Sequence, residues 1–343
     1  MKLTDFTYDL PEELIAQEPA HPRDSSRLLV LDRATSSLTD SVFSSLPSFL
    51  CEGDLLVVND TRVIPARLWG RKPSGGRVEA LLLKRLSERS WETLLRASKR
   101  FGVGSEVILS GDSSLRVVSV LGEGRYVVEL SSEDSPEEAI ERLGEMPLPP
   151  YIRRSSPRAE DKRWYQTLFS SPEKAGSSAA PTAGLHFTEE VRETLRAKGI
   201  TFAHVTLHVG LGTFLPVRAE NLSDHKMHSE VFELTEESAA QINRAKEGGR
   251  RVVAVGTTSA RVLEHCGRSG RVIPSTGETN LFILPGHEFK IVDALLTNFH
   301  LPESTLLMLV CAFGGRDFVL DAYRHAVRES YRFYSYGDSM LIK

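Results

Sequence analysis

The chain has 343 residues, of which 41% are hydrophobic and 26% charged, and its formal net charge is −4 at pH 7. This length allows two or three domains, and the composition is ordinary for a soluble globular protein. The N-terminus is mixed and polar, and no apolar run approaches the ~18 residues of a membrane span. We therefore expect no signal peptide and no membrane contact. The three widely spaced cysteines predict no disulfide framework and fit a reducing cytosol.

The acidic charge balance does not indicate nucleic-acid binding, so any RNA contact must come from a local basic patch. Near the N-terminus, residues 10–17 predict the start of a helix and residues 27–31 a strand. The continuous apolar run 54–58 predicts a buried strand. It is followed directly by Asn59, Asp60 and Arg62. Polar residues in this position contact ligands in α/β proteins, although an Asx-turn explains them equally well.

Residues 63–150 have a different character. Short β-like runs recur there, separated by turns rich in glycine, and a proline cluster closes the segment at 147–150. Regular short strands with such turns are typical of an all-β barrel or sandwich. We predict an inserted β-barrel domain at 63–150, within a discontinuous α/β domain formed by 1–62 and 151–343.

Residues 151–163 contain five basic and two acidic residues, and two aromatic residues follow. Basic side chains with neighbouring aromatics suit a single-stranded RNA loop. The alternative is a solvated charged loop, which composition alone favours. The candidate tRNA contacts are Arg153, Arg154, Arg158, Lys162 and Arg163.

Two loops poor in long side chains, 181–187 and 208–214, flank a predicted helix that starts after Thr188 and a predicted strand at 201–207. Small residues in these loops let the backbone approach a ligand, and each loop places a histidine beside it. For a lone glycine, a tight turn is the better interpretation. The candidate binding residues here are Thr182, Gly184, Gly210, Gly212 and Thr213, and the histidines are His186 and His208.

Further along, a strand at 251–255 runs into Gly256, Thr257, Thr258 and Ser259, before a helix over 262–266. Such a strand–glycine–hydroxyl–helix start points N–H groups and hydroxyls at an anion, although ordinary N-capping is the alternative. The P-loop lysine is missing, which disfavours a nucleoside triphosphate.

The C-terminal third repeats this pattern of strands and polar turns. A turn containing Glu278, Thr279 and Asn280 precedes a predicted strand at 281–284. A strand at 294–297 leads to Asn298 and His300, and then to a helix at 306–313. A final helix at 318–331 precedes Asp338. Histidine pairs at 204/208 and 225/228 lack metal-binding spacing, so we expect structural histidines and no metal.

The motifs identify a family. The stretches that carry the resemblance are PTAGLHF, TLHVGLGTF, VVNDTRVIPARL, DKRWYQTLF, HKMHSE, VVAVGTTSARVLE, TGETNLFILPG, LLTNFHLPESTLLMLVCAF and YRFYSYGDSMLI. They resemble the S-adenosylmethionine:tRNA ribosyltransferase-isomerases, the bacterial enzymes of the queuosine pathway, over nearly the whole chain and in order. One departure is Ser178, where the family pattern has valine.

The resemblance implies an enzyme that transfers and isomerises the ribosyl unit of S-adenosylmethionine onto preQ1 in the tRNA anticodon. The product is epoxyqueuosine, and adenine and methionine leave. S-adenosylmethionine is then a consumed substrate and no cofactor is needed. The implied partner is tRNA carrying preQ1, the location is the cytoplasm, and we expect a monomer.

This chemistry needs a base for the ribose C5′ proton and an acid for the departing adenine. We predict that His186, His208 and His300, with Glu278 and Asp338, face one cavity and transfer these protons. Each histidine lies in a polar or glycine-rich turn that also belongs to a motif. Two alternatives remain: a small-molecule transferase or hydrolase that uses the same cleft without RNA, and a non-catalytic RNA-binding protein with a barrel module.

Overall fold

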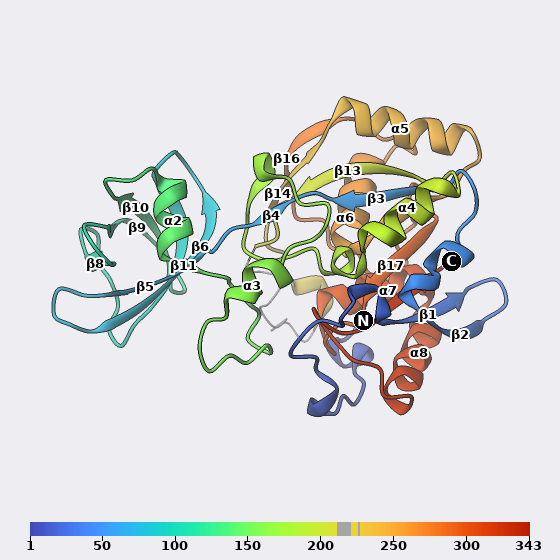
Figure 1. The fold of residues 1–343 in the computed structure, drawn as a ribbon, viewed down its shortest axis with the longest axis horizontal. Coiled ribbons are helices and arrows are strands. Elements are labelled where there is room, and N and C mark those ends of the chain that lie inside the picture. The colour runs from blue at the N-terminus through green and yellow to red at the C-terminus, as the bar shows by residue number, and fades with distance from the viewer. Residues whose placement is uncertain (211–220, 226) are drawn as a thin grey trace.

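The computed structural model describes residues 1–210, 221–225 and 227–343 (Figure 1). Within these residues a mixed sheet of nine strands forms the body of the molecule. In order across the sheet, the strands are β16 (Ser275–Thr279), β14 (Glu230–Leu234), β13 (Thr201–Leu207), β3 (Leu55–Asn59), β15 (Val252–Val255), β17 (Ala294–Asn298), β18 (Ser339–Ile342), β1 (Arg27–Asp32) and β2 (Ser37–Val42). The four neighbours β13, β3, β15 and β17 are parallel, so their carboxyl ends lie at one edge.

Both faces of this sheet are covered, because its central strands are apolar on both sides. In β3, Leu55 and Val57 pack in one core while Leu56 and Val58 pack in the other, as the two-residue period of a strand requires. The first core includes α5 (Glu236–Glu247), α6 (Gly256–Cys266), α7 (Thr305–Gly314) and α8 (Arg316–Arg328), and the second includes α1 (Leu46–Phe49) and α4 (Glu189–Ala197).

A second sheet closes on itself. Six strands in the described chain form a closed antiparallel barrel, sealed by the pairing of Arg71 with Ile108, and a seventh adds to its edge. In order, the strands are β11 (Gly144–Glu145), β5 (Arg67–Arg71), β6 (Arg77–Arg85), β7 (Ser90–Arg96), β10 (Arg125–Ser131), β9 (Ser114–Gly122) and β8 (Glu106–Ile108). The helix α2 (Pro136–Leu143) packs on the separate core of this barrel. The predicted fold class, an α/β body with a β-barrel, is confirmed.

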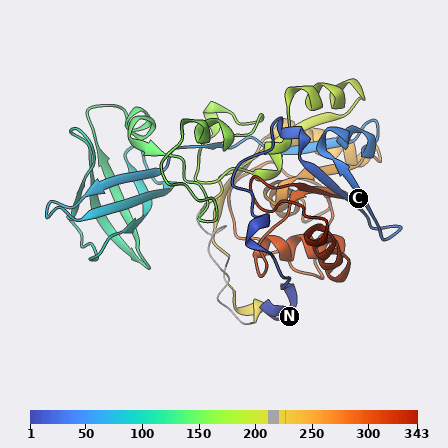
Figure 2. The ribbon, with the colours of Figure 1, turned by 60° about the horizontal axis from the view of Figure 1, so that its bottom comes forward.

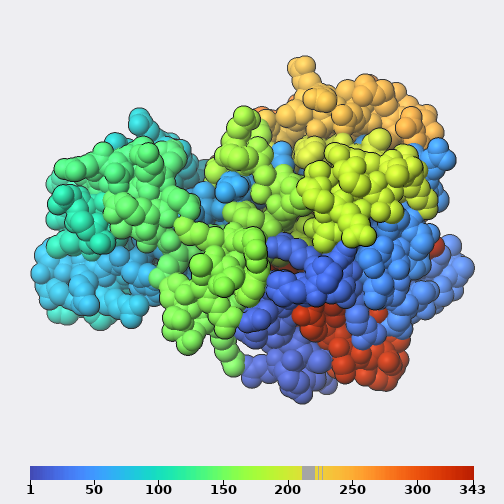
Figure 3. All heavy atoms as spheres, in the orientation of Figure 1, coloured from blue at the N-terminus to red at the C-terminus, as the bar shows by residue number. Residues whose placement is uncertain are grey.

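The barrel stands beside the body as a lobe of its own, and both chain termini lie on the body (Figures 1 and 2). The segment that contains α3 (Ala159–Trp164) fills the space between the two lobes (Figure 3). A short ribbon of β4 (Arg62–Val63) and β12 (Ala175–Ser177) lies near this junction.

Polar contacts join the two lobes. Lys84 of β6 pairs with Glu278 of the large sheet, and Lys162 of α3 pairs with Glu141 of α2 at 2.6 Å. The hydroxyl of Ser178 donates to the carbonyl of Leu82 at 3.0 Å. A valine at 178, as in the family pattern, would lack this bond.

Some predicted elements were wrong, and tertiary contacts explain why. Instead of a helix at 10–17 there is one 3-10 turn, Glu12–Leu14, because Ile15 pairs with Phe333 in an extended bridge. No strand forms at 281–284. The guanidinium of Arg261 donates a hydrogen bond to the Leu281 carbonyl there, at 3.1 Å. The preceding polar stretch is itself the strand β16, paired with β14. The helix α6 begins at Gly256 rather than at residue 262.

The remaining short 3-10 helices are Leu3–Phe6, Arg23–Ser25, Phe43–Ser45, Pro172–Lys174, Thr182–His186 and Leu222–Asp224. Among the described residues, no helix is both long and apolar enough to cross a membrane.

The separate core makes the domain boundaries testable. We expect residues 63–150, expressed alone, to give a β-type circular dichroism spectrum and a cooperative thermal melt, because their buried apolar side chains pack on one another. A helical spectrum, or a melt without cooperativity, would contradict an independent inserted domain.

Candidate functional site

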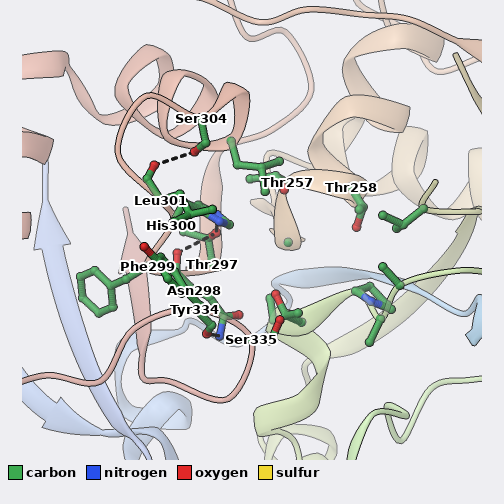
Figure 4. Close-up of a pocket in the computed structure, with 18 of the residues that line it drawn as sticks. Thr257, Thr258, Thr297, Asn298, Phe299, His300, Leu301, Ser304, Tyr334 and Ser335 are labelled. Carbon is green, nitrogen blue, oxygen red and sulfur yellow. Dashed lines mark hydrogen bonds between the residues drawn. The ribbon is translucent and has the colours of Figure 1, made fainter. Parts of the chain in front are cut away.

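A pocket opens at the carboxyl ends of the parallel strands, where open α/β sheets bind ligands (Figure 4). Its hollow measures about 810 Å³ including the open mouth. Its walls come from segments that follow three strands: Val209 after β13, Gly256 after β15 and Phe299 after β17. Tyr151, Tyr165 and Tyr334 also line it. Sheet topology therefore gathers residues from distant parts of the chain.

One wall of the pocket is the start of α6. The helix follows β15 through Gly256, which has a φ of +89°, a conformation that favours glycine. The first N–H groups of a helix have no partner within it, and no described side chain caps this one. Thr257 and Thr258 line the pocket, and the buried Oγ1 of Thr258 has no hydrogen-bond partner in the described part of the chain. The wall therefore offers unpaired donors.

The neighbouring wall contains Thr297, Asn298 and His300 (Figure 4). Asn298 is 1% exposed, and its Nδ2 donates to the Tyr334 carbonyl at 3.0 Å and lies 3.1 Å from Nε2 of His186. Its Oδ1 has no hydrogen-bond partner among the described residues. An unpaired buried acceptor is costly, so this oxygen suits a donor on a ligand.

A buried ion pair also lines the pocket. Glu230, at the start of β14, pairs with Arg261 of α6, and their side chains are 5% and 6% exposed. Glu230 also accepts from the backbone N–H of Gly210 at 3.2 Å. Opposite charges thus lie side by side in a pocket wall that carries no net charge from this pair.

His300 is the titratable ring of this pocket. It is buried, and its Nε2 lies 2.8 Å from the hydroxyl of Thr297. Burial lowers the pKa of His300 to about 3. The ring is therefore neutral at pH 7.

Three comparisons with known proteins agree. The family model described as "Queuosine biosynthesis protein" matches residues 3–342. The chain belongs to this family. It is 53% identical, over 343 residues and 100% of both chains, to the S-adenosylmethionine:tRNA ribosyltransferase-isomerase of Carboxydothermus hydrogenoformans. The relative of that name from Acetivibrio thermocellus is 50% identical over 346 residues, again over 100% of both chains.

A solved structure is also similar. The crystal structure of S-adenosylmethionine tRNA ribosyltransferase from Thermotoga maritima matches with a TM-score of 0.58 and 40% identity, covering 99% of this chain and 100% of that one. The resemblance inferred from the motifs is confirmed.

The structure separates the five predicted acid–base residues of this family member. Of these, His300 alone lines the pocket as the described residues form it, so the prediction that they face one cavity is wrong. His186 is buried, stacks on Phe43 at 5.1 Å, and has its ring nitrogens against Ser26 and Asn298. Burial lowers its pKa to about 3. These contacts give His186 a positioning role behind Asn298.

Asp338 and Glu278 lie elsewhere. The buried carboxylate of Asp338 accepts from the backbone N–H groups of Arg27 and Arg332 at 2.9 and 2.8 Å. Glu278 is exposed on β16, and its hydrogen bond to Lys84 lowers its pKa. Asp338 therefore links two chain segments, and Glu278 links the two lobes.

His208 lies between the two lobes. Its Nδ1 is 2.8 Å from the hydroxyl of Thr61, while its Nε2 makes no hydrogen bond with the described residues, and the side chain is half-buried. A Cβ added to Gly176 would meet the ring at 3.4 Å, so this glycine leaves one face uncovered. Burial, and then Lys174, lower the pKa of His208. A neutral, accessible ring can accept a proton.

A groove of about 1260 Å³, including its open side, runs between barrel and body on the other side of Gly176. Arg62, Lys84, Arg85 and Lys162 line it together with Glu137, Glu138 and Glu141 of α2. Arg62, predicted to bind substrate, therefore belongs to this groove rather than to the pocket.

The other predicted binding residues divide into two groups. Thr182, Thr257, Thr258 and Asn298 line the pocket. The rest of the described ones do not, and most have structural partners: Asn59 (to Leu207 and Thr61), Asp60 (to Thr206), Gly184 (against Thr167), Gly210 (to Glu230), Ser259 (to Val255), Thr279 (to His265) and Asn280, which is exposed. Gly212 and Thr213 lie outside the described residues.

The predicted tRNA contacts are mostly paired with carboxylates. Arg153 pairs with Glu12, Arg158 with Glu18 and Lys162 with Glu141, all at exposed positions. Arg154 forms a double hydrogen bond with Asp161, and both side chains are largely buried. Arg163 is exposed and makes no ion pair within the described chain. Arg154 therefore holds this segment together rather than facing solvent.

Sequence reasoning missed Glu230 and Arg261 as site residues. Both lie in motifs of the resemblance, HKMHSE and VVAVGTTSARVLE, and their place in these motifs could have identified them.

No group of three or more His, Cys, Asp or Glu residues in the described parts of the chain could hold a metal ion.

Proposed function

We propose that this chain transfers and isomerises the ribosyl unit of S-adenosylmethionine onto preQ1 at the anticodon wobble position of tRNA. The product is epoxyqueuosine, and adenine and methionine are released. The observation that carries the proposal is the convergence of motif-bearing segments from residues 179–183, 256–261 and 297–301 on one pocket at the strand ends. S-adenosylmethionine is consumed there as a substrate, so no resident cofactor is needed.

The pocket and the groove suit two different substrates. Thr182, Thr257, Thr258 and Asn298 provide hydroxyl and amide groups that can hold ribose and the methionine end of S-adenosylmethionine. The basic residues of the groove suit the RNA backbone, with Arg153 and Arg163 beyond it. His208 lies between them and is the favoured base, while neutral His300 is placed to donate or accept a hydrogen bond inside the pocket.

An adenine-release assay tests the function. Purified protein is incubated with S-adenosylmethionine alone, with tRNA carrying preQ1, and with the same tRNA lacking preQ1. Adenine that appears only with preQ1-containing tRNA supports the proposal. Turnover without RNA would favour the small-molecule transferase or hydrolase, and binding without turnover a non-catalytic RNA-binding protein.

The protein is expected to act in the cytoplasm as a monomer. Light scattering after size exclusion can check the monomeric state.

Salt dependence tests the RNA surface. Replacing Arg153 and Arg163 by alanine should make the plot of log affinity against log salt shallower by about 0.7–0.9 per lost phosphate contact, because fewer counterions are released. The matched control is Arg324→Ala, an exposed arginine of α8 paired with Asp321. An unchanged slope in the double variant would assign residues 151–163 to a solvated loop.

A further inference from the structure

We propose that the amino-acid end of S-adenosylmethionine docks at the start of α6. Its carboxylate faces the first N–H groups of the helix and the hydroxyl of Thr258, and its ammonium faces Oδ1 of Asn298. The inference rests on the proposed function, and it assigns the recognition of one part of that substrate to specific atoms.

The donors for the carboxylate are on one wall. The N-terminal N–H groups of α6 carry the positive end of the helix dipole, and no side chain that the structure describes caps them. The buried Oγ1 of Thr258 donates its proton to none of the described residues. Arg261 lies one turn further along the same helix and lines the same pocket. Each of these groups favours an anionic ligand atom.

The acceptors for an ammonium are on the neighbouring wall. Val255, the last residue of β15, is paired with Leu296 of β17, so Asn298 lies beside the start of α6. Its Oδ1 accepts no hydrogen bond from the residues that the structure describes, and the side chain is 1% exposed. The hydrogen bond from Nδ2 to the Tyr334 carbonyl fixes which amide atom is the oxygen. A ligand that satisfies both walls must bring an anion and a donor a few bonds apart, as an α-amino acid does.

The buried ion pair fits the same ligand. Glu230 and Arg261 place a negative and a positive charge together in the pocket wall. Because the two charges neutralise each other, a zwitterion adds no net charge to this buried site. A singly charged ligand would bring a charge that the pair does not compensate.

Gly256 keeps the space at the start of α6 open. A Cβ at position 256 would lie 3.3 Å from Oγ1 of Thr258 and 3.6 Å from Cβ of Ala183, filling the space in front of the helix start. The positive φ of Gly256 also turns the chain so that the helix begins at the pocket. The same site should bind the product methionine, which retains the carboxylate and the ammonium.

Calorimetry with two neutral thioethers tests the assignment. S-adenosylhomocysteine has the amino-acid end and 5′-methylthioadenosine lacks it. We expect the wild-type protein to bind the first at least about 10-fold more tightly. Thr258→Val should weaken S-adenosylhomocysteine binding by about 10-fold and leave 5′-methylthioadenosine unchanged, while Thr258→Ser should retain wild-type affinity. Thr194→Val, in the exposed helix α4, is the control that should change neither.

Equal binding of the two ligands to the wild-type protein would overturn this assignment but leave the proposed function standing. An equal loss of both ligands in Thr258→Val, with Thr258→Ser also weakened, would do the same. If neither nucleoside bound at all, the pocket would not be the S-adenosylmethionine site, and the proposed function of the pocket would fail with the inference.

Discussion

Replacing His208 by alanine is expected to reduce adenine release by about 10²–10⁴-fold, the usual contribution of a general acid–base group. The melting temperature and the affinity for S-adenosylhomocysteine should stay close to wild type, because the ring is half-buried and outside the pocket lining. The measurements are steady-state adenine release, calorimetry and a thermal melt.

Geometry selects His208 among the predicted acid–base residues. Its Nδ1 is held by Thr61, while Nε2 makes no hydrogen bond with the described residues, and the ring is half-buried. His186 and His300 are buried, and burial lowers the pKa of each to about 3. Neither ring takes up a proton readily at neutral pH.

The pH profile gives a second readout of the same residue. The pKa of His208 is lowered from 6.5 by burial and by Lys174, with Glu233 opposing. The neutral base is therefore present at pH 7, and turnover should fall only as the pH drops through this lowered pKa. Lys174→Met removes the nearby positive charge, so the pKa should rise and the acid limb should move to higher pH.

The control for His208 is His204→Ala, an exposed histidine on the adjoining strand β13. This variant should keep wild-type turnover. Near wild-type turnover in His208→Ala would remove this histidine from the mechanism.

Local sequence patterns predicted the framework. The apolar run 54–58 became the buried strand β3, and the glycine-separated β runs became the barrel, because periodicity and turn chemistry act over a few residues. The failures lie where distant segments compete. Ile15 forms a β-bridge with Phe333, where a helix was expected. The guanidinium of Arg261 donates a hydrogen bond to the carbonyl of Leu281, in the expected strand at 281–284.

The site was predicted in part for the same reason. Thr257, Thr258, Asn298 and His300 follow predicted strands, and parallel strands bring their carboxyl ends to one edge. The pairing of Glu230 with Arg261 depends on β14 lying against β13, which no local pattern reveals. The enclosure of His186 between Ser26 and Asn298 is likewise a product of chain segments far apart.

Asp338 provides the sharpest test between a catalytic and a structural role. Its carboxylate is 3% exposed and accepts the backbone N–H groups of Arg27, at the start of β1, and Arg332. Hydrogen bonds to a charged group contribute about 1.5–3 kcal/mol each, so Asp338→Ala should lower the free energy of unfolding by roughly 3–6 kcal/mol. Asp338→Asn keeps one oxygen acceptor and should lose about half as much. Urea unfolding measures both, and turnover per folded molecule should remain near wild type at low temperature. A variant that unfolds like wild type but has lost turnover would instead make Asp338 a catalytic residue.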